Sequence, residues 1–270
     1  MKLLKVLIAT ILLLAVVAVN MPVAFAEEIG GSCGNGVMWF FDSATGELKI
    51  SGSGAIDNYT VQNKEEMQEK AEEMTEALGN AEIDDKEDII EYAELIRTIE
   101  SVADTDSPWS EANIEKQIKV ITISDGITEI GNIAFINLPN LTEINFPKTL
   151  KKIGENAFMN CTSLSSVILP DSLEQLGMGA FAFCTELKRV TIPEGITEIE
   201  KMLFMGCVNL ESIEIPDSVE KISSQSFNLC ANLRSIVLPG NLQEIEEMSF
   251  LYCCSLESIG ISEGLTSLNM

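Results

Sequence analysis

The chain of 270 residues is 46% hydrophobic and only 6% aromatic, so its core must be largely aliphatic. Its 42 Asp and Glu residues outnumber 17 Lys and Arg residues, and the formal charge of −25 argues against nucleic acids and anionic membranes as partners, because both select clustered basic residues. The sequence contains no histidine, which excludes Ser-His-Asp and Cys-His catalytic sites and histidine-ligated zinc.

Residues 1–26 have the composition of a secretory signal peptide. Two lysines precede an apolar run at 6–19, and residues 24–26 form an Ala-Phe-Ala cleavage site before Glu27. The apolar run is shorter than the ~20 residues of a membrane-spanning helix. We therefore expect an exported chain that is cleaved before Glu27 and does not insert into the membrane afterwards. An uncleaved anchor is the alternative.

An acidic segment at about 59–103 lies within the N-terminal region 27–117. Between Asn63 and Asp106 it holds 16 acidic and 4 basic residues. Apolar residues at helical spacing predict two helices in this insert. The first carries Met67, Ala71, Met74 and Leu78, and the second carries Ile89, Tyr92, Ile96 and Ile99.

A 23-residue repeat starts at Gly131 and recurs six times without an insertion or deletion. The segment 118–130 is the second half of a further copy. When the copies are aligned, their apolar residues fall into columns. The first two columns are Phe135, Phe158, Phe181, Phe204, Phe227 and Phe250, and Leu138, Cys161, Cys184, Cys207, Cys230 and Cys253.

A short strand is predicted in each copy. Positions 144 and 146 and their equivalents are apolar with one residue between them, and a proline follows in five copies. This spacing is typical of a strand that ends where the ladder cannot continue. One copy buries too few apolar side chains to offset the entropy of ordering 23 residues, so the copies must stack. We predict a curved solenoid with a parallel sheet along one face.

The repeat G-x-x-A-F-x-x-C-x-x-L-x-x-V-x-I-P-x-S-L-x-x-I resembles the BspA-like leucine-rich-repeat family of bacterial surface and secreted proteins. The leader resembles that family in Cys33-Gly34, Trp39, the segment GELKISGSGAI from Gly46, and Ser107-Pro108-Trp109. The resemblance implies an α/β repeat solenoid: a right-handed leucine-rich-repeat superhelix over 118–270 with a parallel sheet on one face, and a β-rich N-terminal cap over 27–117. It also implies adhesion or protein binding at a bacterial cell surface or outside the cell.

The chain departs from the family pattern in two places. The family joins its G-S-G-A and S-P-W segments by a short loop, where this chain has the acidic insert. We expect the insert to be a solvated helical hairpin lying against the cap. A partner-binding arm, or a weak Ca²⁺ site around Asp104 and Asp106, is the alternative, although no twelve-residue calcium loop is present. The sequence stops at Met270, directly after a complete repeat and without a polar capping unit. This predicts a C-terminal continuation or a partner docked at that end.

The cysteine column allows three interpretations. Stacked strands place successive thiols ~5 Å apart, which is within reach of a disulfide, but parallel side chains would strain one. A metal site needs ligands that converge on one point, and a ladder does not supply them. We therefore interpret each cysteine as a small buried hydrophobe equivalent to Leu138. We expect no metal and no other cofactor.

We also expect no enzymatic activity. The segment Ser218-Val219-Glu220-Lys221 matches the S-x-x-K pattern of penicillin-binding enzymes, but other copies read SLEQ or GITE at the same place. The match is therefore a coincidence of the repeat. The sequence contains neither a P-loop nor a dinucleotide-binding G-x-G-x-x-G motif.

The residues that flank the buried strand positions should form exposed columns on the sheet. These columns are Lys119, Thr142, Ser165, Lys188, Glu211, Arg234 and Glu257; Glu143, Ser166, Arg189, Ser212, Ser235 and Ser258; and Asn145, Ile168, Thr191, Glu214, Val237 and Gly260. We predict a shallow, mixed-charge surface there that binds a protein or a glycan. Its candidate contact residues are Lys119, Glu143, Lys188, Arg189, Glu211 and Arg234. Solubilising variation without a ligand, or a passive spacer in a larger surface protein, is the alternative.

Overall fold

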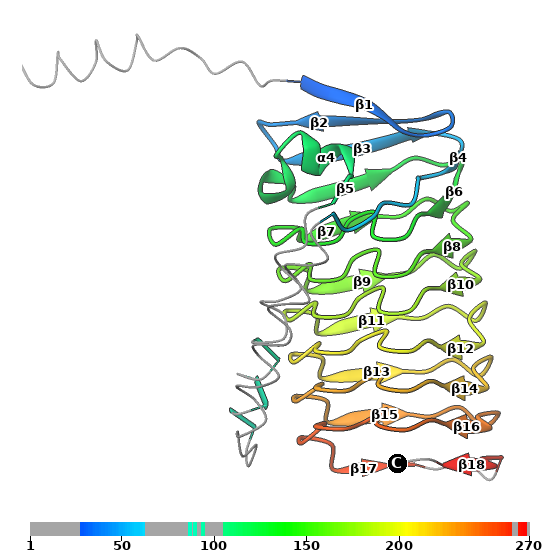
Figure 1. The fold of residues 1–270 in the computed structure, drawn as a ribbon. Coiled ribbons are helices and arrows are strands. Elements are labelled where there is room, and N and C mark those ends of the chain that lie inside the picture. Colours follow the sequence, from blue (N-terminus) through cyan, green and yellow to red (C-terminus); the bar gives the residue numbers. More distant parts are fainter. Residues whose placement is uncertain are drawn as a thin grey trace, which may run out of the picture.

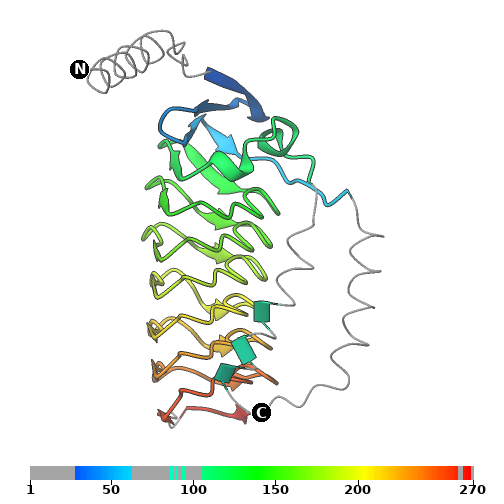
Figure 2. The same cartoon turned by 90° about the vertical axis from the view of Figure 1, so that its left-hand side faces the viewer.

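The computed structural model describes residues 28–62, 86–87, 89–90, 93–94, 105–260 and 264–268. Most of these residues form a stack of rungs, each of them one 23-residue repeat (Figure 1). A rung contains a looped segment, a front strand and a side strand. We call the surfaces built from these parts the turn side, the front sheet and the side sheet. The stack is close to straight when seen from two directions (Figure 2), so the predicted curvature is wrong.

The front sheet contains the predicted strands. They are β5 (Val120–Ile123), β7 (Glu143–Asn145), β9 (Ser166–Ile168), β11 (Arg189–Thr191), β13 (Ser212–Glu214), β15 (Ser235–Val237) and β17 (Ser258–Ile259). From β9 to β15 the middle residue of each strand is buried and its two neighbours are exposed, because alternate side chains of a strand point to opposite faces. Paired strands are parallel, and each residue pairs with the residue 23 positions earlier, as Val190 does with Val167.

A second parallel row, the side sheet, accompanies the front sheet. Its strands are β6 (Ile127–Ile130), β8 (Lys152–Ile153), β10 (Gln175–Leu176), β12 (Glu198–Ile199), β14 (Lys221–Ile222), β16 (Glu244–Ile245) and β18 (Ser267–Leu268). The apolar column at Ile153 is evident in the sequence, but no strand was predicted there. A two-residue strand is too short to show the alternation by which strands are recognised. Strands on two sides hold successive rungs at a similar spacing, and this explains why the stack does not bend.

The N-terminal strands extend both rows. These strands are β1 (Glu28–Gly34), β2 (Val37–Asp42), β3 (Glu47–Gly52) and β4 (Gly54–Ala55). β1, β2 and β3 pair antiparallel, and β3 then pairs in parallel with β5 of the front sheet. β4 pairs in parallel with β6 of the side sheet. The first rung therefore has backbone hydrogen-bond partners on its N-terminal side in both rows.

A short helix and an adjoining 3-10 turn precede the first front strand. Helix α4 (Pro108–Glu111) begins after Ser107, whose side chain accepts a hydrogen bond from the Ser110 amide, and Pro108 occupies its first turn. The 3-10 helix η1 (Glu115–Gln117) leads into β5. Trp109 of α4 is buried and stacks on Phe135, with ring centroids 4.9 Å apart. The helix thereby places the Trp109 ring at the N-terminal end of the column of stacked phenylalanines.

The turn side bends through two left-handed residues in every rung. Positions 133 and 137 and all their equivalents have φ between 52° and 71°. Asparagine or glycine occupies five of these twelve positions, as at Asn137 and Gly179, because both tolerate this conformation. Others, such as Phe183 and Leu229, are held in it by the packing of neighbouring rungs.

The core between the sheets is a continuous stack of rings and thiols. Successive phenylalanines from Phe135 to Phe250 stack with centroids 5.3–6.1 Å apart. The repeat cysteines beside them are buried and free, as the interpretation as small hydrophobes predicts. Each of these five thiols also donates a hydrogen bond of 3.1–3.3 Å to the carbonyl of a phenylalanine 26 residues earlier, as Cys207 does to Phe181. This second role of the cysteines was not predicted.

The described residues of the insert lie on the turn side of the repeats. Ile89 and Ala93 pack against Val208, Leu229 and Ala231, and the residues described at 86–87, 89–90 and 93–94 are helical. The expectation that the insert lies against the cap is therefore wrong for these residues, because the turn side offers them an apolar patch. The first predicted helix, with Met67, Ala71, Met74 and Leu78, and residues Tyr92, Ile96 and Ile99 of the second lie outside the described residues.

Two polar interactions fix the insert at its base and near its start. At the base, Asp106 accepts hydrogen bonds from the amide and the hydroxyl of Thr60 at 2.6 and 2.9 Å. Farther along, the Lys86 ammonium donates to Asn232 and, at 3.1 Å, to Ser255. Asp106 thus joins the two ends of the insert at its base.

Among the described residues, no helix is long and apolar enough to cross a membrane.

Candidate functional site

The front sheet presents the six predicted contact residues to solvent, since Lys119, Glu143, Lys188, Arg189, Glu211 and Arg234 are all exposed. The structure divides them into two groups. Lys119 and Glu143 lie on neighbouring rungs near the N-terminal end, where the Glu143 amide donates to the Lys119 carbonyl at 3.4 Å. The other four residues lie on three consecutive rungs. Among these four, the Arg234 amide donates to the Glu211 carbonyl at 2.9 Å.

Lys151 and Lys221, on or next to the side sheet, form ion pairs within the chain, whereas Lys152 of β8 forms none among the described residues. On the side sheet, Lys221 pairs with Glu246 at 2.6 Å and with Glu198 at 3.4 Å. Hydrogen bonding to Glu246 raises the pKa of Lys221, and the same contact lowers the pKa of the Glu246 carboxyl. Lys151 pairs with Glu174 at 2.5 Å.

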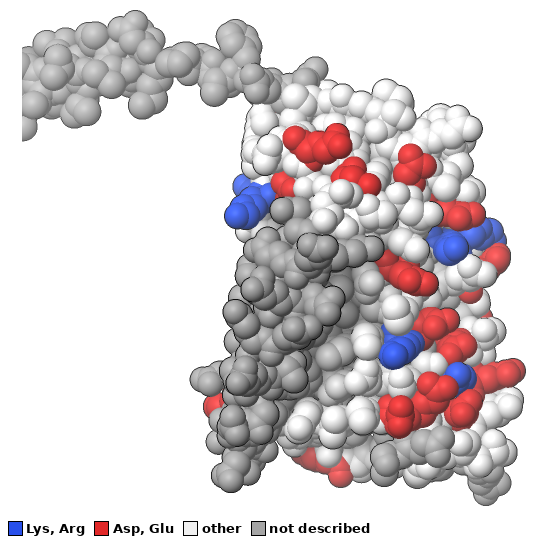
Figure 3. Space-filling view, in the orientation of Figure 1, with Lys and Arg blue, Asp and Glu red and all other residues white. Residues whose placement is uncertain are grey.

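On the front sheet, Lys119, Lys188, Arg189 and Arg234 form no ion pair within the described part of the chain. These four cations stand in a protein of net charge −25. Figure 3 shows one face of the molecule, and acidic side chains clearly outnumber basic ones on it. Unpaired cations on the front sheet are therefore available to an acidic group of a ligand.

Two hollows open on the front sheet. The first lies between β7 and β9, has a volume of about 400 Å³ and includes Phe146 and Ile168 in its lining. The second lies between β11 and β13, has a volume of about 650 Å³ and is lined by residues that include Arg189 and Val237. Ile168 and Val237 are large aliphatic residues with exposures of 77% and 63%. Both residues belong to a predicted exposed column, but the hollows beside them were not predicted.

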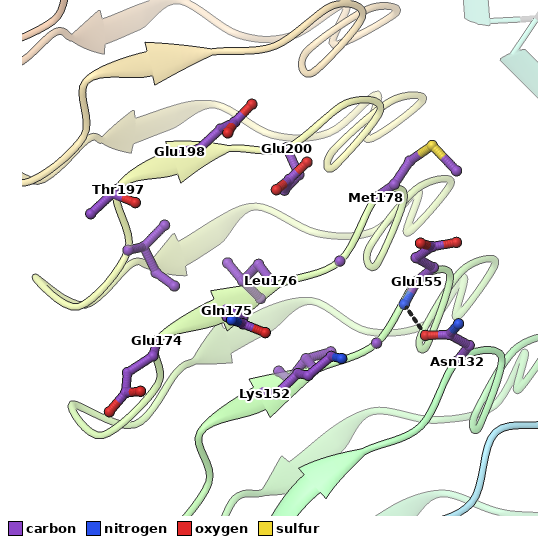
Figure 4. A pocket seen from close by; sticks show the side chains of 14 residues that line it. Asn132, Lys152, Glu155, Glu174, Gln175, Leu176, Met178, Thr197, Glu198 and Glu200 are labelled. Carbon is purple, nitrogen blue, oxygen red and sulfur yellow. Dashed lines mark hydrogen bonds between the residues drawn. The ribbon is translucent and has the colours of Figure 1, made fainter.

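A third hollow, of about 530 Å³, lies on the side sheet (Figure 4). Its lining includes the carboxylates of Glu155, Glu174, Glu198 and Glu200, and Lys152 as its only cation. Burial, and then the neighbouring charge of Glu198, raise the pKa of Glu200. None of the described residues forms a group of His, Cys, Asp or Glu that could hold a metal ion.

The S-x-x-K match does not bring its serine and lysine into a reactive pair. The Ser218 hydroxyl donates to the carbonyl of Ile196 at 2.6 Å, while Lys221 pairs with Glu198 and Glu246. Burial raises the pKa of the column thiols, to about 12 for Cys161, so these thiols stay protonated at neutral pH and are poor nucleophiles.

Comparison with protein families gives one match, to the BspA type leucine-rich repeat region. Six copies of this repeat match, over residues 111–204 and 151–270, which together cover more than half of the chain. None of the curated proteins matches the sequence.

Several solved structures are similar to the chain. A leucine-rich repeat protein from Bacteroides ovatus has 25% identity and a TM-score of 0.46, over 56% of this chain and 45% of that one. One from Eubacterium ventriosum has 13% identity and a TM-score of 0.45, over 89% and 92% of the two chains. A leucine-rich cell surface protein from Faecalibacterium prausnitzii has 15% identity and a TM-score of 0.36, over 87% and 95%. The chain thus spans less than half the length of the first of these proteins.

Proposed function

Since the chain belongs to the BspA-type leucine-rich-repeat family, we propose that it is a protein-binding module of a bacterial cell surface whose front sheet carries the contact surface. The contact residues of this proposal are Lys119, Glu143, Lys188, Arg189, Glu211 and Arg234, all of them exposed. No catalytic or cofactor chemistry is part of the proposal.

One observation carries the choice of the front sheet. Lys119, Lys188, Arg189 and Arg234 are unpaired among the described residues, whereas Lys151 and Lys221 on or beside the side sheet already bind carboxylates of this chain, and the unpaired Lys152 there lies in a hollow lined by four glutamates. A paired charge must give up its partner before it can bind a ligand, whereas an unpaired exposed charge need only lose water. Binding of an acidic ligand group should therefore cost less free energy on the front sheet than at Lys151 or Lys221.

A protein ligand is favoured over a glycan by the aliphatic side chains of the front sheet. Ile168 and Val237 are largely exposed, and their burial would release apolar surface from water. A protein partner supplies aliphatic and acidic groups together, which suits the mixture of exposed aliphatic residues and free cations. We regard the passive spacer as the competing function.

Export and capping complete the proposal. Residues 1–26 serve as a cleaved signal peptide, and β1, β2 and β3 act as a cap that occupies the N-terminal end of the stack. The intact mass of protein purified from an exporting host tests the first point, since cleavage before Glu27 gives one defined mass.

Charge reversal on the front sheet tests the function. The variant Lys188→Glu/Arg189→Glu/Arg234→Glu should capture extracellular proteins from a surface extract at least tenfold less than the unmodified chain does. The matched control is Lys148→Glu/Lys151→Glu/Lys152→Glu, which changes three exposed lysines outside the front sheet and the net charge by the same amount. Equal loss in both variants, or no loss in the first, would contradict a front-sheet contact surface and favour the spacer.

A further inference from the structure

The front ladder of hydrogen bonds is interrupted between β7 and β9 and again between β11 and β13, and only at the second of these places, which we call the seam, is the side ladder interrupted too. Neither the front strands β11 and β13 nor the side strands β10 and β12 pair with each other. Directly after the side strands, Gly154, Gly177, Ser223 and Glu246 each donate an amide hydrogen bond of 2.8–2.9 Å to the rung before. Glu200 lacks this bond to the preceding rung, as does Gly131, which follows the N-terminal strands. Phe181 and Phe204, on the two sides of the seam, have ring centroids 6.1 Å apart, against 5.3–5.7 Å for the other phenylalanine pairs.

The seam lies where a glycine column ends. A Cβ on Gly154 would come within 2.5 Å of Asn132, and one on Gly177 within 2.4 Å of the Glu155 amide nitrogen, so glycine allows these rungs to approach closely. Glu200 is the first residue of the column with a side chain. Its Cβ needs room that the preceding rungs do not provide, so the side strands β10 and β12 do not pair there, whereas the turn side stays joined, as by the Phe183 amide and the Met205 carbonyl at 2.7 Å.

The larger front hollow is the opening of this seam. Its volume of about 650 Å³ falls within the range of ~300–1,000 Å³ that ligand pockets occupy. Arg189 and Glu214 come from the two strands that fail to pair, and Val237 comes from the next rung. The seam thus places a free guanidinium, a carboxylate and an exposed aliphatic side chain around one hollow.

The charges around this hollow are ordered along the strand direction. The cation Arg189 stands at the start of its strand, whereas Glu214 ends its strand and Asp217 follows the next turn. At about 3.3 Å per residue, the start and end of these strands are ~7 Å apart. An extended peptide presents every second side chain on one side at the same spacing of ~7 Å. Val237 occupies the same strand-end position as Glu214, so an acidic residue at Arg189 and an aliphatic residue two positions on at Val237 fit this spacing, and a basic residue a further two positions on extends toward Asp217.

We propose that this hollow anchors an extended peptide segment of the pattern acidic–x–aliphatic–x–basic. The inference rests on the proposed function and specifies its ligand. The acidic residue binds Arg189, the aliphatic residue packs on Val237, and the basic residue binds Asp217. A sulfated glycan fits less well, because it brings no aliphatic group for Val237 and its sulfates repel the carboxylates. The side-sheet hollow fits less well too, because Glu174 and Glu198 in its lining are already paired.

Selection from a random twelve-residue phage-display library on the unmodified full chain tests this proposal. The selected peptides should share the pattern, and Val237→Asp should weaken their binding at least tenfold. Arg189→Glu should change the selected pattern, replacing the acidic position by Lys or Arg. The substitution Glu200→Gly, designed to close the seam without adding bulk, should also weaken binding about tenfold and should not lower the midpoint of unfolding.

Two controls separate this proposal from the general function. Ile168→Asp alters the other front hollow and should leave peptide binding unchanged, as should Lys148→Glu/Lys151→Glu/Lys152→Glu. Absence of a shared pattern, or peptides that bind Val237→Asp as well as the original chain, would overturn the hollow as the anchor. In that case, if Lys188→Glu/Arg189→Glu/Arg234→Glu still captured fewer extracellular proteins than the unmodified chain, the proposed function would stand. Only the assignment of this peptide ligand would then fail.

Discussion

The repeat cysteines combine two properties that few other side chains offer together. Each is small enough for the interior of a rung, and each donates its thiol proton to a phenylalanine carbonyl of the preceding rung, as Cys230 does to Phe204 at 3.3 Å. Leucine would fill the space but leave that acceptor without its donor, and serine would add the cost of burying a more polar group. The sequence pattern revealed the burial. It could not reveal the donation, because the acceptor lies 26 residues away on a different rung.

Stability in alkali follows from these thiols. Burial raises the pKa of Cys161, Cys207 and Cys253 from 9.0 to about 12. The unfolded chain therefore releases thiol protons above pH 9 while the folded chain retains them. Each buried thiol then costs roughly 1.4 kcal/mol of unfolding free energy per pH unit between pH 9 and 12, and nothing below pH 9. Urea unfolding at pH 8, 9 and 10 should show a steep loss above pH 9.

A single thiol can be isolated by substitution. Cys207→Val keeps the buried volume similar and removes one titrating group, so its unfolding free energy should fall less steeply above pH 9, by roughly 1.4 kcal/mol per pH unit. Cys254→Ala alters the exposed cysteine and should leave the slope unchanged. An identical slope for Cys207→Val and the original chain would show that other groups control alkaline unfolding.

At the scale of the strand, the front sheet was predictable and the side sheet was not. The alternation around Ile144 and its equivalents, followed by proline, is a complete strand signal. The side strands are two residues long and carry one buried residue each, such as Ile153. The seam could not be predicted from the sequence, for a different reason. We attribute it to Glu200, whose effect on the pairing of the side strands appears only when successive rungs are placed against each other.

Gly177 gives a prediction at the same scale. Gly177→Ala places a Cβ 2.4 Å from the Glu155 amide nitrogen, which is backbone and cannot move aside alone. We expect a loss of roughly 1–3 kcal/mol in unfolding free energy, as for other overpacked sites. Gly240→Ala is the matched control, because a Cβ there meets nothing within 4 Å. Equal effects of the two substitutions in urea unfolding would mean that the glycine column does not set the rung spacing.

The candidate site divides in the same way. Exposure of Arg189, Arg234 and the other predicted contact residues follows from the strand pattern. Their lack of partners does not, because the pairing of Lys221 with Glu198 and Glu246 depends on which acidic side chains the neighbouring rungs place within reach. The same holds for the insert. The helical spacing of its apolar residues can be seen in the sequence, but its packing on Val208 and Leu229 cannot, because that apolar patch forms only when successive rungs stack.

At the scale of the whole molecule, the charge of −25 acts against the compact state. Like charges repel over about a Debye length, ~30 Å at 10 mM salt and ~8 Å at 150 mM, so added salt should relieve the repulsion. We expect the thermal midpoint to rise by about 2–5 °C between these salt concentrations. A falling midpoint would show that ion pairs such as Lys221 with Glu246 outweigh the repulsion.

The packing of the insert on the repeats changes the order in which the rungs can unfold. In a linear array each rung touches only its neighbours, so unfolding can start at the C-terminal end and proceed rung by rung. The contacts of Lys86 with Asn232 and Ser255, and of Ile89 with Leu229, join residues of the insert to the last two rungs. Stretching the molecule from its ends must break this cross-connection before those rungs peel off. The array therefore gains a long-range cooperativity that its repeats alone would not have.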